Sequence, residues 1–161
     1  MDNHLVSNAV FLAERLNSEI SASTEDREAK LHFLAECYMA EQNPHKVTSL
    51  LKGANSHGNR YLYALACFKT NNLSEGEKAL TKTGNMPNGA AGYYLLGQIC
   101  EKLGRISDAK NYFAKALQLN PVLWTAYEKL CKMGYAMDAG IFSGDDSTVE
   151  SSNRPDPENV F

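Results

Sequence analysis

The stretch GRISDAKNYFAKALQLNP, residues 104–121, decides the fold class of this chain. Ala109, Phe113 and Ala116 recur at i, i+4 and i+7, which places them on one stripe of an α-helix. Two of these three side chains are small, so a second helix can approach closely while the Phe113 ring fills the space between. Pro121 cannot continue a helix, so the segment ends just before it. A chain that repeats this arrangement is expected to stack pairs of helices.

The residues upstream of this stretch complete a known repeat pattern. The tetratricopeptide repeat is a helix-turn-helix unit of about 34 residues with W-x2-L-G-x2-Y, then A-x3-F, then P. With Ala90 as its first position, the chain has Tyr93 for the Trp and Cys100 for the Tyr, and the other signature residues match in type. We expect these residues to pack the repeat and the helix that follows it: Tyr93, Leu96, Gly97, Ala109, Phe113, Ala116, Pro121 and Trp124.

Two earlier repeats are expected at equivalent spacing. Their stacking residues are Tyr63, Ala64, Cys67, Gly76 and Leu80 in one unit, and Leu34, Ala35, Tyr38, Val47 and Leu51 in the other. Asn43 and Pro44 predict a helix start, and Ser74 with Glu77 predicts a capping box. Half-units are expected at SNAVFLAERL, residues 7–16, and at VLWTAYEKLCKMG, residues 122–134. Only MDNHL is left for the helix before residue 7, which indicates a truncated start or a vestigial helix.

The predicted fold is therefore all-α, a right-handed tetratricopeptide-repeat solenoid with about three full repeats over residues 1–142. Residues 143–161 carry five acids and one arginine, are polar and lack periodicity, so we expect a disordered acidic linker that the folded repeats do not need. The net charge of −3 argues against nucleic acid as a partner. No apolar run is long enough to cross a membrane, and no signal-peptide pattern is present.

The cysteine spacing and the absence of catalytic motifs both argue against an enzyme. Cys37, Cys67, Cys100 and Cys131 are 30, 33 and 31 residues apart and contain no C-x-x-C pair, so we expect reduced structural thiols in a cytoplasmic or nuclear protein. Nucleotide-binding, serine-hydrolase and zinc-protease motifs are absent. We expect no enzyme activity, catalytic residue, cofactor, metal or small-molecule substrate.

The inner groove of such a solenoid is lined by the first helix of each repeat, at positions not used for stacking. These positions are His32, Glu36, Met39, Tyr61, Leu65, Phe68, Tyr94, Gln98 and Glu101. An apolar patch in a groove is typical of an interface, here for an amphipathic helix. Alternatively, these side chains cover one another, or the terminal helix folds over them. We predict a twofold homodimer in which the first helix enters the partner's groove, through Val10, Phe11, Met39, Tyr61, Leu65, Phe68 and Tyr94.

Several segments resemble one family in particular. NAVFLAERL (8–16), LLKG (50–53), LSEGEKAL (73–80) and LNPVLWTAYEKLCKMG (119–134) are similar to the amino-terminal region of the third-subunit family of the anaphase-promoting complex, or cyclosome. The resemblance implies a non-catalytic, homodimerising scaffold of a cell-cycle ubiquitin ligase, in contact with other subunits of that complex, in the nucleus and cytoplasm. It also implies that this region lacks the site for activator tails. The alternative is a co-chaperone-type adaptor that binds a peptide or helix in its groove.

Overall fold

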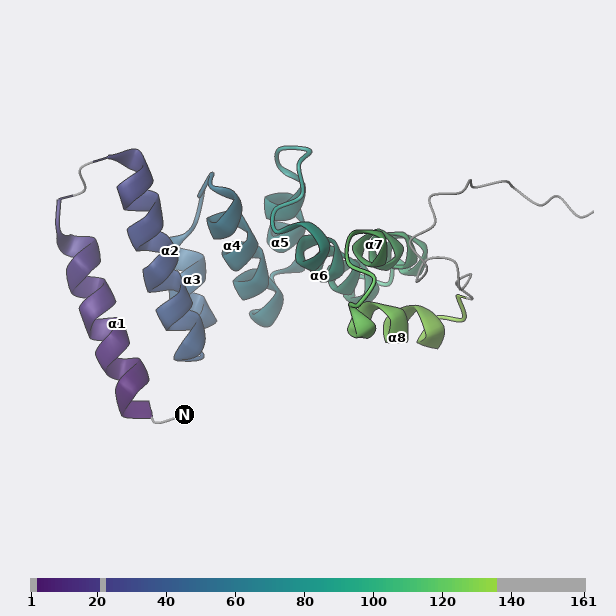
Figure 1. The fold of residues 1–161 in the computed structure, drawn as a ribbon, viewed down its shortest axis with the longest axis horizontal. Helices are drawn as coiled ribbons and strands as arrows, with labels where there is room; N and C mark the ends of the chain where they lie inside the picture. The colour runs from purple at the N-terminus through teal and green to yellow at the C-terminus, as the bar shows by residue number, and fades with distance from the viewer. Residues whose placement is uncertain (1–2, 21–22, 136–161) are drawn as a thin grey trace, which may run out of the picture.

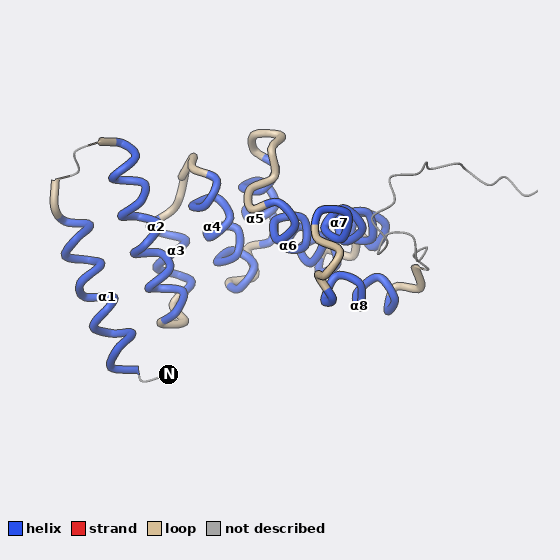
Figure 2. Tube along the Cα trace, viewed as in Figure 1, coloured by secondary structure: helices blue, strands red, loops and turns tan. Residues whose placement is uncertain are grey.

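The computed structural model describes residues 3–20 and 23–135 (Figure 1). Over those residues the chain is entirely helical, without strands (Figure 2). The elements are α1 (Asn3–Ser18), α2 (Thr24–Ala40), α3 (Pro44–Leu50), α4 (His57–Lys69), α5 (Leu73–Thr81), α6 (Gly89–Lys102), α7 (Ile106–Leu119) and α8 (Trp124–Lys132). None of these helices is long and apolar enough to cross a membrane. The predicted acidic linker, residues 143–161, lies outside the described residues.

The helices form a row of antiparallel pairs that runs from α1 to α8 (Figure 1). The pairs α2–α3, α4–α5 and α6–α7 are the three predicted repeats, while α1 packs on α2 and α8 packs on α7. Helix α4 also contacts both α2 and α6, so these three helices form one layer, which we call the inner layer. Helices α1, α3, α5 and α7 form the outer layer. Helix α1 is continuous from Asn3 to Ser18, so residues 3–5 belong to the same helix as SNAVFLAERL.

Local capping explains where two of the helices begin. The main-chain N–H of Lys46 donates to Asn43 Oδ1 at 3.4 Å, and Pro44 occupies the first turn of α3 as predicted. The prediction of a capping box at Ser74 and Glu77 is wrong. Helix α5 begins two residues earlier, after Asn72, and the Glu77 carboxylate instead forms an ion pair with Arg105 of the next repeat at 2.7 Å.

The repeat register is confirmed by close packing at its small residues. A Cβ atom added to Gly97 would lie 2.6 Å from Cε1 of Phe113, so glycine lets α6 lie directly against that ring. Leu96, Ala109, Phe113 and Ala116 are all fully buried. Trp124 is an exception, and its assignment to repeat packing is wrong. Its side chain is 67% exposed and contacts Tyr127 of the same helix, with ring centroids 5.2 Å apart.

Two hydrophobic clusters form the core and meet at α4. Ala66 belongs to the cluster built from α1, α2 and α3, whereas Ala64 belongs to the cluster built from α5 to α8. The cysteines Cys37, Cys67 and Cys100 are buried and unpaired, and burial raises the pKa of each thiol. They therefore fill space as expected, whereas Cys131 is exposed.

Candidate partner interface

Helix α1 has apolar side chains on two faces, and only one of them is covered by the chain. Val10 and Ala13 are buried against α2, at 6% and 1% exposed. The prediction that Val10 faces a partner is therefore corrected, because its side chain belongs to the core. The opposite side of the helix presents the exposed residues Leu5, Phe11, Leu12 and Leu16. Three of them, Leu5, Leu12 and Leu16, follow i, i+7, i+11 and form one outward stripe.

The apolar residues predicted to line the groove lie on the inner layer, but they are half-buried rather than open. Tyr61, Leu65 and Phe68 of α4 pack against the second core cluster, and so does Tyr94 of α6. Met39 of α2 packs against the first cluster. Burial raises the pKa of the Tyr61 phenol, as expected for a ring set into an apolar surface. The structure thus brings together the groove residues of α4 and α6 along one layer.

Part of this surface is covered by the chain itself, as one of the alternatives anticipated. Lys102 Nζ lies 4.1 Å from the centroid of the Phe68 ring, a cation–π contact from α6 to α4. The Tyr94 ring lies 5.5 Å from that of Phe113. At the end of the row, Lys129 Nζ of α8 forms an ion pair with Glu101 at 2.8 Å. The chain's own contacts therefore cover part of Phe68 in the middle repeat and of Tyr94 in the next one.

A buried polar cluster holds the first two inner-layer helices together. Asn59 of α4 is fully buried, and its amide donates to the main-chain carbonyl of Glu28 at 3.2 Å and to the Glu28 carboxylate. Its Oδ1 therefore faces His32, whose Nδ1 donates to it at 2.9 Å. His32 Nε2 lies 3.5 Å from a Glu36 oxygen. The inner-layer position of His32 thus serves α2–α4 packing.

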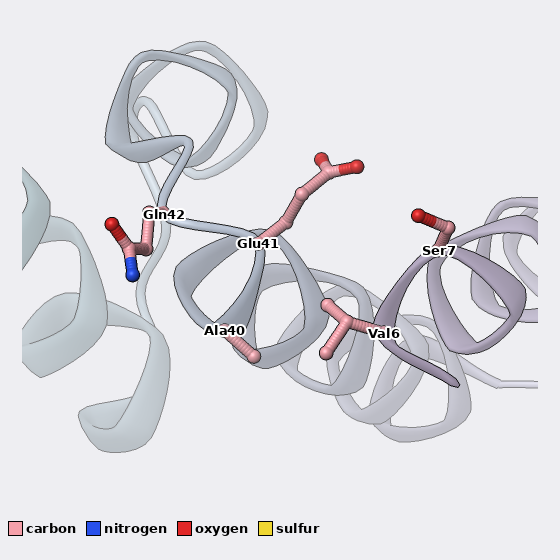
Figure 3. A pocket seen from close by; sticks show the side chains of 5 residues that line it. All are labelled: Val6, Ser7, Ala40, Glu41 and Gln42. Carbon is pink, nitrogen blue, oxygen red and sulfur yellow. The ribbon is translucent and has the colours of Figure 1, made fainter. Parts of the chain in front are cut away.

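Helix α1 is attached to the first repeat by a second polar contact. The Tyr38 hydroxyl donates to Glu14 Oε1 at 2.6 Å, and Lys46 Nζ lies 4.6 Å from the centre of the Tyr38 ring. Further along α1, a hollow of about 360 Å³ separates Val6 and Ser7 from the end of α2. Figure 3 shows Val6 directed toward the end of α2, while Gln42 points away from α1. The hollow has no convergent set of polar groups, so it is a packing gap between α1 and the end of α2.

Some exposed apolar residues were not identified from the sequence. Leu5 and Leu16 of α1 and Phe33 of α2 are 68%, 40% and 47% exposed. The i, i+7, i+11 spacing of the α1 leucines is a usable signal, but it is lost when MDNHL is read as a preceding helix. For Phe33 no such signal exists, because its neighbour Leu34 is buried on the same helix.

The described residues contain no group of His, Cys, Asp or Glu side chains that is arranged to hold a metal ion. What the described surface does offer is exposed apolar area on α1, together with half-buried apolar side chains on the middle repeat. Such an arrangement can bind another helical surface.

The fold and the register define this chain as a tetratricopeptide-repeat protein. Residues 90–121, which begin and end where the sequence pattern places them, match the tetratricopeptide repeat profile. Two solved structures share the fold. MamA has a TM-score of 0.68 and 19% identity over 80% of this chain and 76% of that one. The anaphase-promoting complex hetero-tetramer Cut9–Hcn1 has a TM-score of 0.67 and 22% identity over 79% of this chain and 26% of that one.

Residues 2–83 match the profile of the family described as anaphase-promoting complex, cyclosome, subunit 3. The chain belongs to this family. It is 38% identical to cell division cycle protein 27 homolog B of Arabidopsis thaliana, over 88% of this chain and 19% of the relative. It is 31% identical to the human cell division cycle protein 27 homolog, over 100% of this chain and 19% of the relative. The chain spans about a fifth of the length of these relatives.

Proposed function

We propose that this chain is a non-catalytic scaffold segment of an anaphase-promoting complex, a cell-cycle ubiquitin ligase, and that it pairs with a second copy of itself. The exposed apolar stripe of α1 carries this proposal. Helix α1 presents the apolar side chains of Leu5, Phe11, Leu12 and Leu16 to solvent. This surface calls for a protein partner.

A second copy is the partner that fits both exposed surfaces at once. A twofold axis lets α1 of each copy meet the inner layer of the other, so that Phe11 and Leu12 contact Leu65 and Phe68. The aromatic residues near the centre of such an interface are expected to contribute most of its binding energy. Family membership supports the scaffold role, and the hetero-tetramer formed by the fold relative Cut9–Hcn1 supports contacts with other subunits of the complex. The unpaired thiols support a place in the nucleus and cytoplasm.

The adaptor alternative has less support. Grooves that hold peptide carboxylates present Lys, Arg and Asn at inner positions. Here the middle repeat presents Tyr61, Leu65 and Phe68, and the inner-layer residue Asn59 is fully buried and donates to Glu28.

The solution mass tests the proposal. We expect the chain at micromolar concentration to have twice its monomer mass of 17.8 kDa by light scattering. Leu12→Glu and Leu65→Glu place a charge against apolar partners and should each give a monomer with unchanged helix content. Gln118→Glu, at an exposed position of α7, is the matched control and should remain dimeric.

Each of the other possible outcomes rejects one part of the proposal. A monomeric wild type rejects self-association of this segment. Dissociation by Leu12→Glu alone means that α1 pairs with α1 and not with the inner layer. Unfolding of Leu65→Glu, in place of dissociation, rejects the groove assignment.

A further inference from the structure

A basic pocket lies on the outer-layer side of the molecule, between the turn that follows α3 and the helix α5. Its volume is about 330 Å³. Apolar parts of the wall come from Leu51, Ala54, Tyr63 and Ala79. Its charged lining residues are Lys52, Arg60, Lys78, Lys82 and Glu75. Four cations and one carboxylate leave the pocket with a formal charge of 4 − 1 = +3.

Arg60 contributes a buried positive charge to this pocket. Its side chain is 2% exposed, and it donates to the carbonyls of Ala79 and Leu80, each at 3.0 Å, and to Thr83 Oγ1. These bonds satisfy carbonyls at the end of α5 but do not neutralise the guanidinium. Within the described residues no carboxylate forms an ion pair with it. A buried charge without a counter-charge interacts strongly with any anion that reaches it, since the local dielectric is low.

The lysines at the rim are available for an anion. Lys52 is exposed and makes no ion pair or hydrogen bond within the part of the chain that the structure describes. Lys82 Nζ donates to the neutral Asn55 Oδ1 at 2.9 Å. Lys78 forms a 2.9 Å ion pair with Glu75, but its side chain is 74% exposed, so this pair adds little stability.

The arrangement of these cations suits an extended acidic segment better than a single small anion. The lysines come from two sides, Lys52 from the turn after α3 and Lys78 and Lys82 from α5 and its end. Lysine is a flexible point charge, so such a rim follows charges spread along a chain, whereas a phosphate cradle uses converging, rigid donors. The apolar wall gives the aliphatic parts of a peptide a surface to contact.

We propose that this pocket binds an acidic segment of polypeptide, and that residues 143–152 of this same chain, SGDDSTVESS, are that segment. The segment has Asp145, Asp146 and Glu150 and no cation, so its charge of −3 complements the pocket. Phosphorylation of a serine there would add about −1.5 to −2 at pH 7 and strengthen the contact. The pocket lies on the outer layer, away from the inner-layer residues proposed for dimerisation, so the two proposals stand or fall separately.

The test uses the full chain and a fluorescein-labelled peptide of sequence SGDDSTVESS, followed by fluorescence anisotropy at low salt. In the wild type the chain's own segment competes for the pocket. A full chain with Asp145→Asn, Asp146→Asn and Glu150→Gln is therefore expected to bind the peptide at least tenfold more tightly than the wild type. Adding Lys52→Glu and Lys82→Glu to that chain should weaken binding at least tenfold, and about 0.5 M salt should do the same. If the chain with Lys52→Glu and Lys82→Glu loses helix content, the milder pair Lys52→Gln and Lys82→Gln replaces it in the test.

Matched controls separate a pocket from general charge attraction. Lys69→Glu with Lys115→Glu, at exposed positions outside the pocket, should change binding less than twofold. A peptide phosphorylated at Ser147 and Ser151 should bind more tightly, while inorganic phosphate at the peptide's concentration should not displace it. Equal losses from both lysine pairs, or displacement by phosphate, would overturn the assignment. Equal binding of the peptide by the wild type and the neutralised chain would show that the segment does not occupy the pocket.

Discussion

At the scale of single residues, the fold depends on small side chains placed where helices meet. Gly97 lies against the Phe113 ring, and Gly76 occupies the position in the middle repeat that Ala109 holds in the next one, where an added Cβ would lie 3.3 Å from the Ala64 carbonyl oxygen. Interiors are packed as densely as organic crystals, so an added methyl group at such a contact displaces a neighbour. The expected cost differs between the two sites, because 2.6 Å at Gly97 is far tighter than 3.3 Å at Gly76.

A double-mutant cycle tests the contact between Gly97 and Phe113. Gly97→Leu should lower the free energy of unfolding by about 1–3 kcal/mol or more, and Gly97→Ala by less. Adding Phe113→Leu to Gly97→Ala should cost less than the sum of the two single changes, because a smaller side chain accepts the new methyl group. Urea unfolding gives the free energies of the four proteins in the cycle: the wild type, Gly97→Ala, Phe113→Leu and the double variant. Additive effects would mean that these residues do not share the packing contact.

At the scale of elements, the two ends of the row are attached differently. Helix α8 joins the last repeat through buried Ala126 and Leu130. Helix α1 uses Val10 and Ala13 together with the hydrogen bond from Tyr38 to Glu14. Burial, followed by the bond to Glu14, raises the pKa of Tyr38 to about 12. Attachment of α1 should therefore depend on the protonation of this phenol.

The pH dependence follows from the direction of that shift. The folded-state pKa lies above the ordinary value of 10.0, so the neutral phenol is the form that the fold stabilises. Its contribution is complete below pH 10 and is lost as the pH rises toward 12. We expect wild type to be more stable than Tyr38→Phe by about 1 kcal/mol at pH 8, and this difference to shrink above pH 10.

Chemical unfolding at pH 8, 9, 10 and 11 measures the difference between the two proteins. Tyr63, whose pKa is also raised to about 12, is present in both and cancels in the comparison. A difference that stays constant through pH 11 would show that the hydroxyl does not hold α1 in place.

At the scale of the whole molecule, each helix pair relies on its neighbours, because the two core clusters run along the row and meet at α4. A solenoid of this kind gains stability from interfaces between adjacent units. The buried residues of both clusters come from residues 10 to 130, and we expect this helical core to be stable without residues 143–161.

Limited proteolysis of the full chain tests this domain boundary. We expect cleavage after about residue 142 to leave a helical core with an unchanged melting temperature. If the acidic segment occupies the basic pocket, cleavage should be slower at low salt in the wild type than in the chain with Lys52→Glu and Lys82→Glu. A core that melts at a lower temperature after cleavage would contradict the boundary.

The sequence by itself determined the features that repeat with a short period. The stacking positions of Gly97 and Phe113 and the helix start at Asn43 and Pro44 follow from local spacing, because neighbours along one helix or within one repeat set them. The family resemblance rests on other short segments, residues 8–16, 50–53, 73–80 and 119–134. These features are confirmed by the buried core and by the match over residues 90–121.

Only the tertiary structure decided which apolar faces are covered. Val10 is buried while the adjacent Phe11 and Leu12 are exposed, and Trp124 is exposed although it follows the repeat signature. Ser74 does not cap α5, because the helix already begins after Asn72, and Glu77 pairs with Arg105 of the next repeat. Arg60 reaches partners about 20 residues away in sequence, at the end of α5. The physical reason is common to these cases: exposure and long-range pairing depend on which helices lie alongside one another, and this arrangement is made by the packing of the whole row.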